Sequence, residues 1–184
     1  VRAFFHTYGL PTLTTNCSNN YGPYQFPEKL IPLMIMNMLE GKALPVYGDG
    51  KNIRDWLYVE DHASAVWQVI REAPAGESYN VGGENEWENI TLLNRLIEIV
   101  AEKSGQNPEK IRQTITYVKD RPGHDLRYAI DAGKIKNDLG WTPITKIDAG
   151  IAATIDWYLE NTEWLDNVTS ADYQKYYEEQ YVKR

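Results

Sequence analysis

The sequence of 184 residues contains a single cysteine, Cys17, and three scattered histidines, His6, His62 and His124. One cysteine excludes an intramolecular disulfide, and we expect no metal site built on cysteine ligands. The histidines show none of the paired spacings that zinc enzymes use, so we expect no bound metal. This cysteine usage is typical of a cytoplasmic protein, which is the localisation that we predict.

The sequence also lacks an excess of positive charge and any long hydrophobic run. Lysine and arginine together number 19 and aspartate and glutamate 26, which gives a formal net charge of -7. Nucleic acids and anionic membrane surfaces attract basic proteins, and no apolar run approaches the ~18 residues of a membrane span. Residues 1–9 are too short, and too interrupted by Arg2 and His6, for a signal peptide. We therefore expect neither a nucleic acid nor a membrane as a partner.

A third absence is the glycine-rich strand-to-helix turn of a dinucleotide-binding domain. The nearest match, residues 48–50, has no third glycine and no helical pattern after it. Tyr47 and Lys51 have the spacing of a catalytic Tyr-x-x-x-Lys pair, but the turn between them keeps the two side chains off one helix face. We assign no catalytic residue. Because the chain opens on the last turns of a helix, residues 1–8, we expect it to be part of a longer protein.

The segments that are present alternate between strand and helix patterns, which predicts an α/β fold with strands too few and scattered for a complete doubly wound sheet. We expect strands at residues 12–15, 44–47, 53–59, 78–81 and 115–118. We expect helices at residues 1–8, 28–40, 61–74, 91–105, 131–140, 147–158 and 170–183.

The expected helices carry cap and face signals. Asp61, Thr91 and Asp131 are predicted N-caps, because short polar side chains bond the free N–H groups of a first turn. The helix at residues 28–40 is apolar nearly all round, so it should be buried. The predicted inner faces are Ala63, Val66, Trp67 and Ile70 after the first cap, Leu93, Leu96, Ile97 and Val100 after the second, and Ile147, Ile151, Ile155 and Tyr158 in the helix at 147–158.

The first candidate site is the polar run at residues 16–23, which combines amides, hydroxyls and a Gly-Pro turn after a predicted strand. Open α/β sheets bind ligands where strands end. The residues Glu28, Lys29 and Leu30 follow it. The run either lines a ligand crevice or is a turn whose polar groups are satisfied internally.

A second candidate site combines Pro45, Val46 and Tyr47 with Arg54. A tyrosine ring stacks on a nucleobase, and a guanidinium holds a phosphate through two parallel hydrogen bonds. The alternative is an ordinary hairpin in which Tyr47 packs and Arg54 pairs with Asp55.

A third candidate site is the turn at residues 120–125, Asp-Arg-Pro-Gly-His-Asp, which follows a predicted strand. Pro-Gly constrains the backbone that presents Arg121 and His124. Arg121 can clamp a phosphate that Asp120 helps to orient, and His124 can donate to an oxygen. The alternative is a solvated loop with weak local ion pairs. Asn89, in a polar loop, is a fourth and weaker candidate, because an asparagine beside a cap is usually loop chemistry.

Three segments carry a resemblance that runs along essentially the whole chain: NCSNNYGPYQFPEKLIP (residues 16–32), LPVYGDGKNIRDWLYVEDH (44–62) and DRPGHDLRYAID (120–131). The chain resembles the C-terminal half of the dTDP-glucose 4,6-dehydratase family, in the extended short-chain dehydrogenase/reductase superfamily. The first and third segments are specific to sugar-nucleotide dehydratases and their nearest relatives.

The resemblance implies the C-terminal part of that NAD-binding Rossmann-like fold, with mixed small sheets, packed helices and no glycine-rich half. Residues 1–25 and about 56–82 would include the last elements of the Rossmann sheet, and the rest would form the substrate lobe. The family is a lyase that converts dTDP-glucose to the 4-keto-6-deoxy sugar with bound NAD. Its catalytic residues and most NAD contacts lie in the half absent from this chain, so we expect the chain alone to be inactive, and the full-length protein to be a homodimer.

The resemblance also assigns site residues. Asn20 would contact NAD. The residues that would contact the nucleotide sugar are Asn19, Lys29, Leu30, Pro45, Val46, Tyr47, Arg54, Asn89, Asp120, Arg121, Pro122, Gly123, His124 and Tyr181. Three alternatives remain open: another nucleotide-sugar dehydratase, a UDP-glucose 4-epimerase, and a non-catalytic nucleotide-sugar-binding module.

Overall fold

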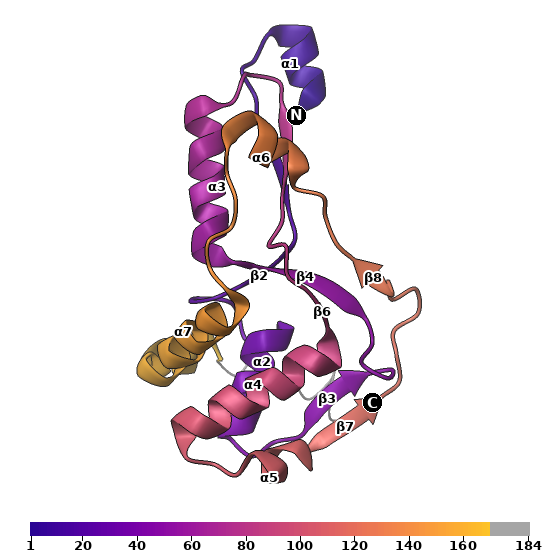
Figure 1. The fold of residues 1–184 in the computed structure, drawn as a ribbon, viewed down its shortest axis with the longest axis vertical. Helices are drawn as coiled ribbons and strands as arrows, with labels where there is room; N and C mark the ends of the chain where they lie inside the picture. The colour runs from indigo at the N-terminus through magenta and orange to yellow at the C-terminus, as the bar shows by residue number, and fades with distance from the viewer. Residues whose placement is uncertain (170–184) are drawn as a thin grey trace. The chain divides into compact units, whose positions relative to one another are not determined.

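The computed structural model describes residues 1–169, and these form two compact units (Figure 1). Unit 1 comprises residues 1–21, 53–87 and 126–147. Unit 2 comprises residues 22–52, 88–125 and the described residues from 148 onward. The helix expected at residues 170–183 lies outside the described residues. Helices and strands alternate along the chain, which confirms the predicted α/β class.

Unit 1 is built on short parallel strand pairs. Strand β1 (Thr14–Cys17) pairs in parallel with β5 (Ser78–Val81). Strand β4 (Ile53–Tyr58) pairs in parallel with β2 (Asn19–Tyr21) and with β8 (Arg127–Tyr128). The order β2-β4-β6 is completed by β6 (Glu86–Glu88). Parallel strands require crossover connections, and α3 (Val59–Glu72) lies in the one between β1 and β5.

The core of unit 1 lies between β5, α3 and α6 (Gly133–Leu139). The unit also contains the short helix α1 (Arg2–Tyr8), which ends at Gly9 as its left-handed C-cap. The buried apolar side chains of this core are Leu57, Ala65, Val69, Tyr79, Val81, Ala132, Ile135 and Trp141.

The predicted inner face of α3 is wrong. The helix begins at Val59, so Asp61 is no N-cap; its buried carboxylate accepts a hydrogen bond from Thr145 N at 2.9 Å. Ala65 and Val69 lie on the same face as Asp61 and are buried, whereas Trp67 and Ile70 are each 61% exposed. The small residues allow close packing on β5, and the satisfied carboxylate lets Asp61 face inward with them.

Unit 2 packs helices against another parallel strand pair, β3 (Leu44–Tyr47) with β7 (Ile115–Val118). Its helices are α2 (Leu30–Leu39), α4 (Asn89–Ser104), α5 (Pro108–Arg112), α7 (Ile147–Glu160) and α8 (Thr162–Val168). The expected burial of α2 and of the predicted inner faces of α4 and α7 is confirmed. Two predicted caps are wrong in position: the N-cap of α4 is Glu88 rather than Thr91, and that of α6 is Ala132, although Asp131 does accept a bond from Gly133 N.

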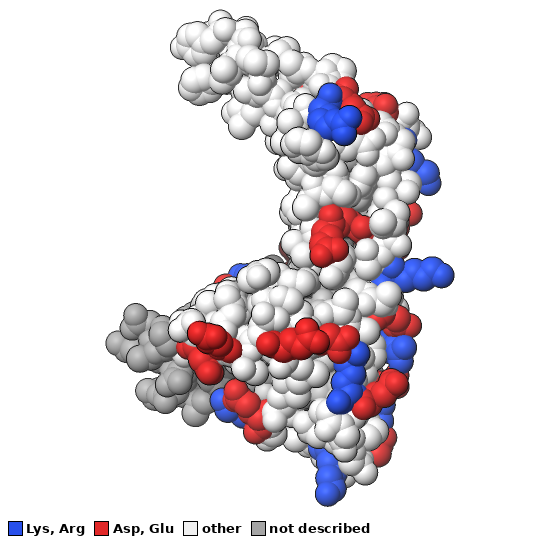
Figure 2. All heavy atoms as spheres, turned by 90° about the vertical axis from the view of Figure 1, so that its left-hand side faces the viewer, with Lys and Arg blue, Asp and Glu red and all other residues white. Residues whose placement is uncertain are grey.

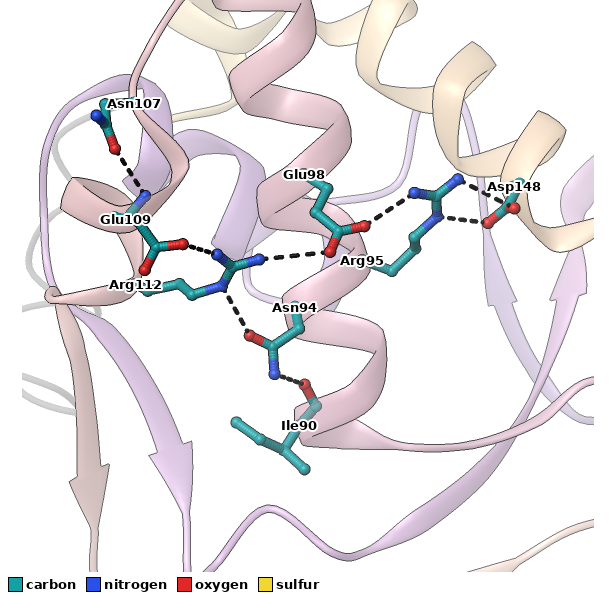
Figure 3. A network of polar contacts seen from close by, with 8 residues as sticks. All are labelled: Ile90, Asn94, Arg95, Glu98, Asn107, Glu109, Arg112 and Asp148. Carbon is teal, nitrogen blue, oxygen red and sulfur yellow. Dashed lines mark hydrogen bonds and ion pairs between the residues drawn. The ribbon is translucent and has the colours of Figure 1, made fainter.

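A polar network runs along α4 in unit 2 (Figure 3). Arg95 donates two hydrogen bonds to Asp148 of α7, from Nε at 2.8 Å and from Nη2 at 3.1 Å. Glu98 accepts from Arg95 and from Arg112 of α5, so one carboxylate links two guanidinium groups. The network ties α5 and α7 to the middle of α4.

The surface carries mixed charge. On the face drawn in Figure 2, basic side chains lie singly or beside acidic ones rather than in a broad patch. Within residues 1–169, no helix has the length and apolar character to span a bilayer. The same residues contain no group of three or more His, Cys, Asp or Glu side chains arranged to hold a metal ion.

Candidate functional site

The polar run at residues 16–23 is mostly strand rather than turn. Residues up to Cys17 continue β1, and Asn19 to Tyr21 form β2 beside β4. Asparagine is a poor strand former, which is why its pattern did not predict β2. Pairing with the largely buried strand β4 overrides that preference, and it fixes Asn19 opposite Trp56 and Asn20 opposite Leu57.

Asn20 is held at both ends of its side-chain amide. Its Nδ2 donates to Ser18 O at 3.0 Å, and its Oδ1 lies 2.8 Å from His62 Nδ1. An amide oxygen only accepts, so His62 Nδ1 carries the hydrogen. Burial lowers the pKa of His62, which favours this neutral form. The predicted helix at residues 61–74 includes His62, and α3 contains it, but the sequence did not predict that its ring contacts Asn20.

Two predicted ligand contacts contain buried polar atoms without a partner. The side-chain oxygens of Asn19, in unit 1, and of Asn89, in unit 2, accept no hydrogen bond from residues 1–169. Buried polar atoms in folded proteins are nearly always paired. Both side-chain oxygens therefore remain able to accept a hydrogen bond from a group outside residues 1–169.

The second and third candidate segments meet in unit 2. Strands β3 and β7 run parallel with Tyr47 opposite Val118, so the turns that follow them emerge at the same edge. Gly48 N donates to Val118 O at 3.0 Å, and a Cβ built on Gly48 would lie 3.1 Å from Asp120 Oδ2. The alternative of an ordinary β3–β4 hairpin is excluded, because β3 pairs with β7.

Four side chains at this edge form what we call the arginine cluster: Tyr47, Asp120, Arg121 and His124. The Arg121 guanidinium lies over the Tyr47 ring, with Cζ 5.3 Å from the centroid. The His124 ring meets the same tyrosine edge-on, with centroids 6.3 Å apart and planes at 82°. The DRPGH turn is thus organised around an aromatic ring, although its residues 121–123 are exposed.

Hydrogen bonds inside the arginine cluster fix the tautomer of His124. Arg121 Nη2 lies 3.0 Å from His124 Nε2, and a guanidinium only donates, so Nε2 is an acceptor. The hydrogen is therefore on Nδ1, which donates to Asp120 Oδ1 at 2.6 Å. This bond, together with one from the Arg121 backbone N–H, lowers the pKa of Asp120. The chain Asp120–His124–Arg121 holds the guanidinium in one orientation.

The remaining predicted residues occupy varied positions. Pro45 and Val46 are buried in β3 beside Tyr47, and Pro122 and Gly123 form the tight turn closed by His124 N and Arg121 O at 3.2 Å. Lys29 is the exposed N-cap of α2 and pairs with Glu28 at 2.6 Å, and Leu30 is the first residue of that helix. Tyr181 lies outside the described residues.

Arg54 does not pair with Asp55, contrary to the alternative considered for that segment. Its Nη1 donates to Ile53 O at 2.7 Å. The buried Asp55 carboxylate instead accepts from Gly83 N and Asn85 N, each at 2.8 Å. Gly83 is required there, because a Cβ would lie 1.9 Å from Trp56 O. Arg54 belongs to unit 1 and Arg121 to unit 2.

Chemically, the arginine cluster offers a permanent cation, an aromatic ring and a fixed imidazole. A guanidinium pairs bidentately with phosphate, and an aromatic ring stacks on a base. The cluster therefore suits a ligand that carries both groups, which is a nucleotide.

Comparisons with known proteins find similarity to nucleotide-sugar dehydratases. A family model described as GDP-mannose 4,6 dehydratase matches residues 1–154. The dTDP-glucose 4,6-dehydratase of Salmonella typhimurium is 57% identical over 100% of this chain and 51% of its own length. The crystal structure of the Bacillus anthracis dTDP-glucose 4,6-dehydratase in complex with NAD is 49% identical, with a TM-score of 0.77 over 89% of this chain and 49% of that one.

A second solved structure agrees. The dTDP-glucose 4,6-dehydratase of Streptomyces venezuelae, with NAD bound, is 43% identical, with a TM-score of 0.81 over 91% of this chain and 49% of that one. The chain thus spans about half the length of the curated relatives it matches. These matches confirm the predicted resemblance and the fold class that it implied.

Proposed function

The chain belongs to the GDP-mannose 4,6 dehydratase family, and we propose that it is the nucleotide-sugar-binding portion of a dTDP-glucose 4,6-dehydratase. The identity to curated dehydratases of that substrate supports the choice of dTDP-glucose. The observation that carries the proposal is the arginine cluster, which joins the second and third resembling segments into one nucleotide-binding arrangement.

In this proposal the unit-2 residues hold the nucleotide. Arg121 pairs with the diphosphate, and Tyr47, flanked by Pro45 and Val46, stacks on the base. Asn89 accepts from the ligand through its unpartnered oxygen. Lys29, Leu30, Asp120, Pro122, Gly123 and His124 complete these contacts, together with Tyr181.

The unit-1 residues serve the sugar nucleotide and NAD. Arg54 adds to the diphosphate contacts, Asn19 binds the sugar nucleotide and Asn20 contacts NAD. His62 and Ser18 fix both ends of the Asn20 amide, which fits a residue that must present one face to a cofactor. When bound, NAD would supply the hydride chemistry that a 4,6-dehydration of the sugar requires.

The whole protein would be a hydro-lyase whose acid, base and catalytic tyrosine come from the half of the relatives that this chain does not match. Residues 1–25 and about 56–82 would complete the cofactor-binding sheet, and the rest would form the substrate lobe. We place this protein in the cytoplasm as a homodimer. The chain alone is expected to be inactive.

The direct test uses the completed protein, in which the segment that this chain lacks is supplied from the Salmonella typhimurium relative. Given dTDP-glucose and NAD, it should release a product lighter by one water, detected by mass spectrometry. A product of unchanged mass but altered C4 configuration would instead identify an epimerase. The DRPGHD segment, which carries the resemblance to sugar-nucleotide dehydratases and their nearest relatives, argues against that outcome.

Two other candidates are separated by simpler measurements. Turnover of a sugar nucleotide with another base, and not of dTDP-glucose, would identify a different nucleotide-sugar dehydratase. Calorimetry of the 184-residue chain with dTDP tests a stand-alone binding module. We expect weak or no binding there, because part of the pocket wall comes from the other half.

A further inference from the structure

Two buried polar atoms without a protein partner lie on neighbouring strands of unit 1. Asn19 of β2 and Trp56 of β4 are opposite residues in a parallel register, so their side chains leave the same face of the sheet. Asn19 Oδ1 and Trp56 Nε1 are both buried, and neither has a hydrogen-bond partner within residues 1–169. Trp56 is only 5% exposed. An unused acceptor and an unused donor therefore face the same side.

Trp141, the other buried tryptophan of unit 1, shows the usual arrangement. Its Nε1 donates to Ser64 Oγ at 3.0 Å, and that hydroxyl donates onward to Asp61 O at 2.7 Å. Buried indole N–H groups normally find such partners, because a desolvated donor without one is unfavourable. The N–H of Trp56, in contrast, has no such partner within residues 1–169.

We propose that Asn19 and Trp56 together bind one hydroxyl group of a polyhydroxylated ligand, which makes Trp56 a further binding residue. A hydroxyl satisfies both atoms at once: its hydrogen is donated to Asn19 Oδ1, and its oxygen accepts from the indole N–H. A phosphate oxygen would satisfy only Trp56, and an ammonium group only Asn19. The inference rests on the proposed function for the ligand itself, a hexose or deoxyribose hydroxyl of the sugar nucleotide.

The strand alternation of β4 supports this assignment. Arg54 and Trp56 are two positions apart and leave the same face, whereas Asp55 and Leu57 leave the other. Asp55 uses its carboxylate on the backbone of Gly83 and Asn85, and Leu57 packs in the core of unit 1. The polar side chain of Asp55 is therefore satisfied on one face of β4, whereas the indole N–H of Trp56 lies on the other face without a partner within residues 1–169.

The test is Trp56→Phe in the completed protein, measured by calorimetry with dTDP-glucose. The substitution removes the indole N–H together with the pyrrole half of the ring, and the loss of the hydrogen bond should lower the affinity about 2- to 12-fold, the range for one neutral hydrogen bond. The melting temperature should fall as well, because the smaller ring leaves a cavity at a buried position, so the change in affinity, compared with that of a second buried tryptophan, decides the test. Unchanged affinity would overturn the proposal, as would a loss of stability without a loss of affinity.

Trp141→Phe is the matched control. It removes the N–H that Ser64 uses, so it should lower the melting temperature and leave the affinity for dTDP-glucose unchanged. A double variant, Trp56→Phe with Asn19→Ala, tests whether one hydroxyl serves both residues. Its loss of affinity should be smaller than the product of the two single losses, since the shared group can be lost only once. If the loss of affinity in the double variant equals the product of the two single losses, the two residues do not share one hydroxyl.

The source of the hydroxyl is separated by repeating the titration with dTDP. If Trp56→Phe weakens the binding of dTDP-glucose alone, the hydroxyl belongs to the hexose. If it weakens the binding of dTDP equally, the hydroxyl belongs to the deoxyribose.

NMR gives a second test. In the wild type, the indole N–H resonance of Trp56 should shift on addition of dTDP-glucose while that of Trp141 stays in place; a fixed Trp56 resonance would overturn the proposal. If the wild type binds no sugar nucleotide, the proposed function falls and this inference with it. Wild-type binding with an unaffected Trp56→Phe variant overturns the inference alone.

Discussion

The guanidinium of Arg121 lies over the ring of Tyr47, 5.3 Å from its centroid, although the two residues come from separate segments of unit 2. The parallel pairing of β3 with β7 brings them together, because both segments leave the sheet at one edge. One face of the tyrosine ring is therefore covered by a cation. A nucleobase that stacks on Tyr47 would therefore lie against the opposite face of its ring.

The first prediction concerns this ring. Tyr47→Leu in the completed protein should weaken dTDP binding by about 5- to 150-fold, because base–aromatic stacking contributes ~1–3 kcal/mol. Tyr47→Phe keeps the ring and should bind nearly as the wild type does. Calorimetry with dTDP measures both. Tyr117→Leu, on the neighbouring strand and 60% exposed, is the matched control and should have no effect. Equal affinity of Tyr47→Leu and the wild type would remove Tyr47 from the site.

The second prediction concerns the Asp120 carboxyl. The hydrogen bond from His124 is the main cause of its lowered pKa, so carbon NMR should give Asp120 a midpoint below 3.8. In His124→Gln the midpoint should rise. A depressed carboxyl pKa stabilises the fold above the unfolded value, and this contribution is lost as the pH falls through the folded pKa. Asp120→Asn should therefore show a shallower loss of stability below pH 3.8. A midpoint that His124→Gln leaves unmoved would contradict the contact.

The third prediction concerns His62. Burial lowers its pKa from 6.5, so the unfolded chain takes up a proton at a higher pH than the folded chain does. The free energy of unfolding should then fall as the pH drops below 6.5. His62→Gln can still donate to Asn20 but does not titrate, so its stability should vary less with pH in that window. Urea unfolding at several pH values measures this, with His6→Gln, at an exposed position, as the control. Parallel pH profiles for wild type and His62→Gln would refute the assignment.

The elements that the sequence predicted well are those with strong periodicity. The strands at residues 44–47, 78–81 and 115–118 match the structure residue for residue, and the apolar faces of α2, α4 and α7 are buried as expected. Glycine ended α4 and α6 where predicted, because Gly105 and Gly140 adopt the left-handed conformation.

What the sequence could not predict depends on partners distant in the chain. Strand β2 is polar and exists because β4 lies beside it. Asp61 has the chemistry of a cap, but its carboxylate accepts a hydrogen bond from the backbone N–H of Thr145. The face of α3 that carries Asp61 is therefore the buried one. The contact of His62 in α3 with Asn20, and the binding role proposed for Trp56 beside Asn19, gave no local signal, because both depend on residues of β2 that are distant in the sequence. The resemblance assigned the residues of the candidate site, but only the structure shows how the side chains of the arginine cluster contact one another.

The fourth prediction concerns the network of Figure 3. Asp148 accepts two hydrogen bonds from Arg95, but the two side chains are 56% and 36% exposed, so solvent weakens the pair. Asp148→Asn should lower the free energy of unfolding by no more than ~1 kcal/mol. The loss should shrink at high salt, which screens exposed charges.

Glu102→Gln is the control for this network, because Glu102 is an exposed residue of α4 that makes no ion pair with residues 1–169. Chemical unfolding at two salt concentrations measures both variants. A loss from Asp148→Asn that is independent of salt would mean that the pair acts by packing rather than by charge.

The most direct test of the account is the affinity of the completed protein for dTDP after Arg121→Gln. A charge-assisted hydrogen bond contributes ~1.5–3 kcal/mol, so we predict binding weaker by about 10- to 150-fold. Arg121→Lys should fall between, because it keeps the charge but loses the planar fork and the stack on Tyr47. Arg112→Gln, a unit-2 arginine outside the arginine cluster, should bind as the wild type does. If Arg121→Gln and the wild type bind dTDP equally, the arginine cluster is not the nucleotide site and the account is wrong.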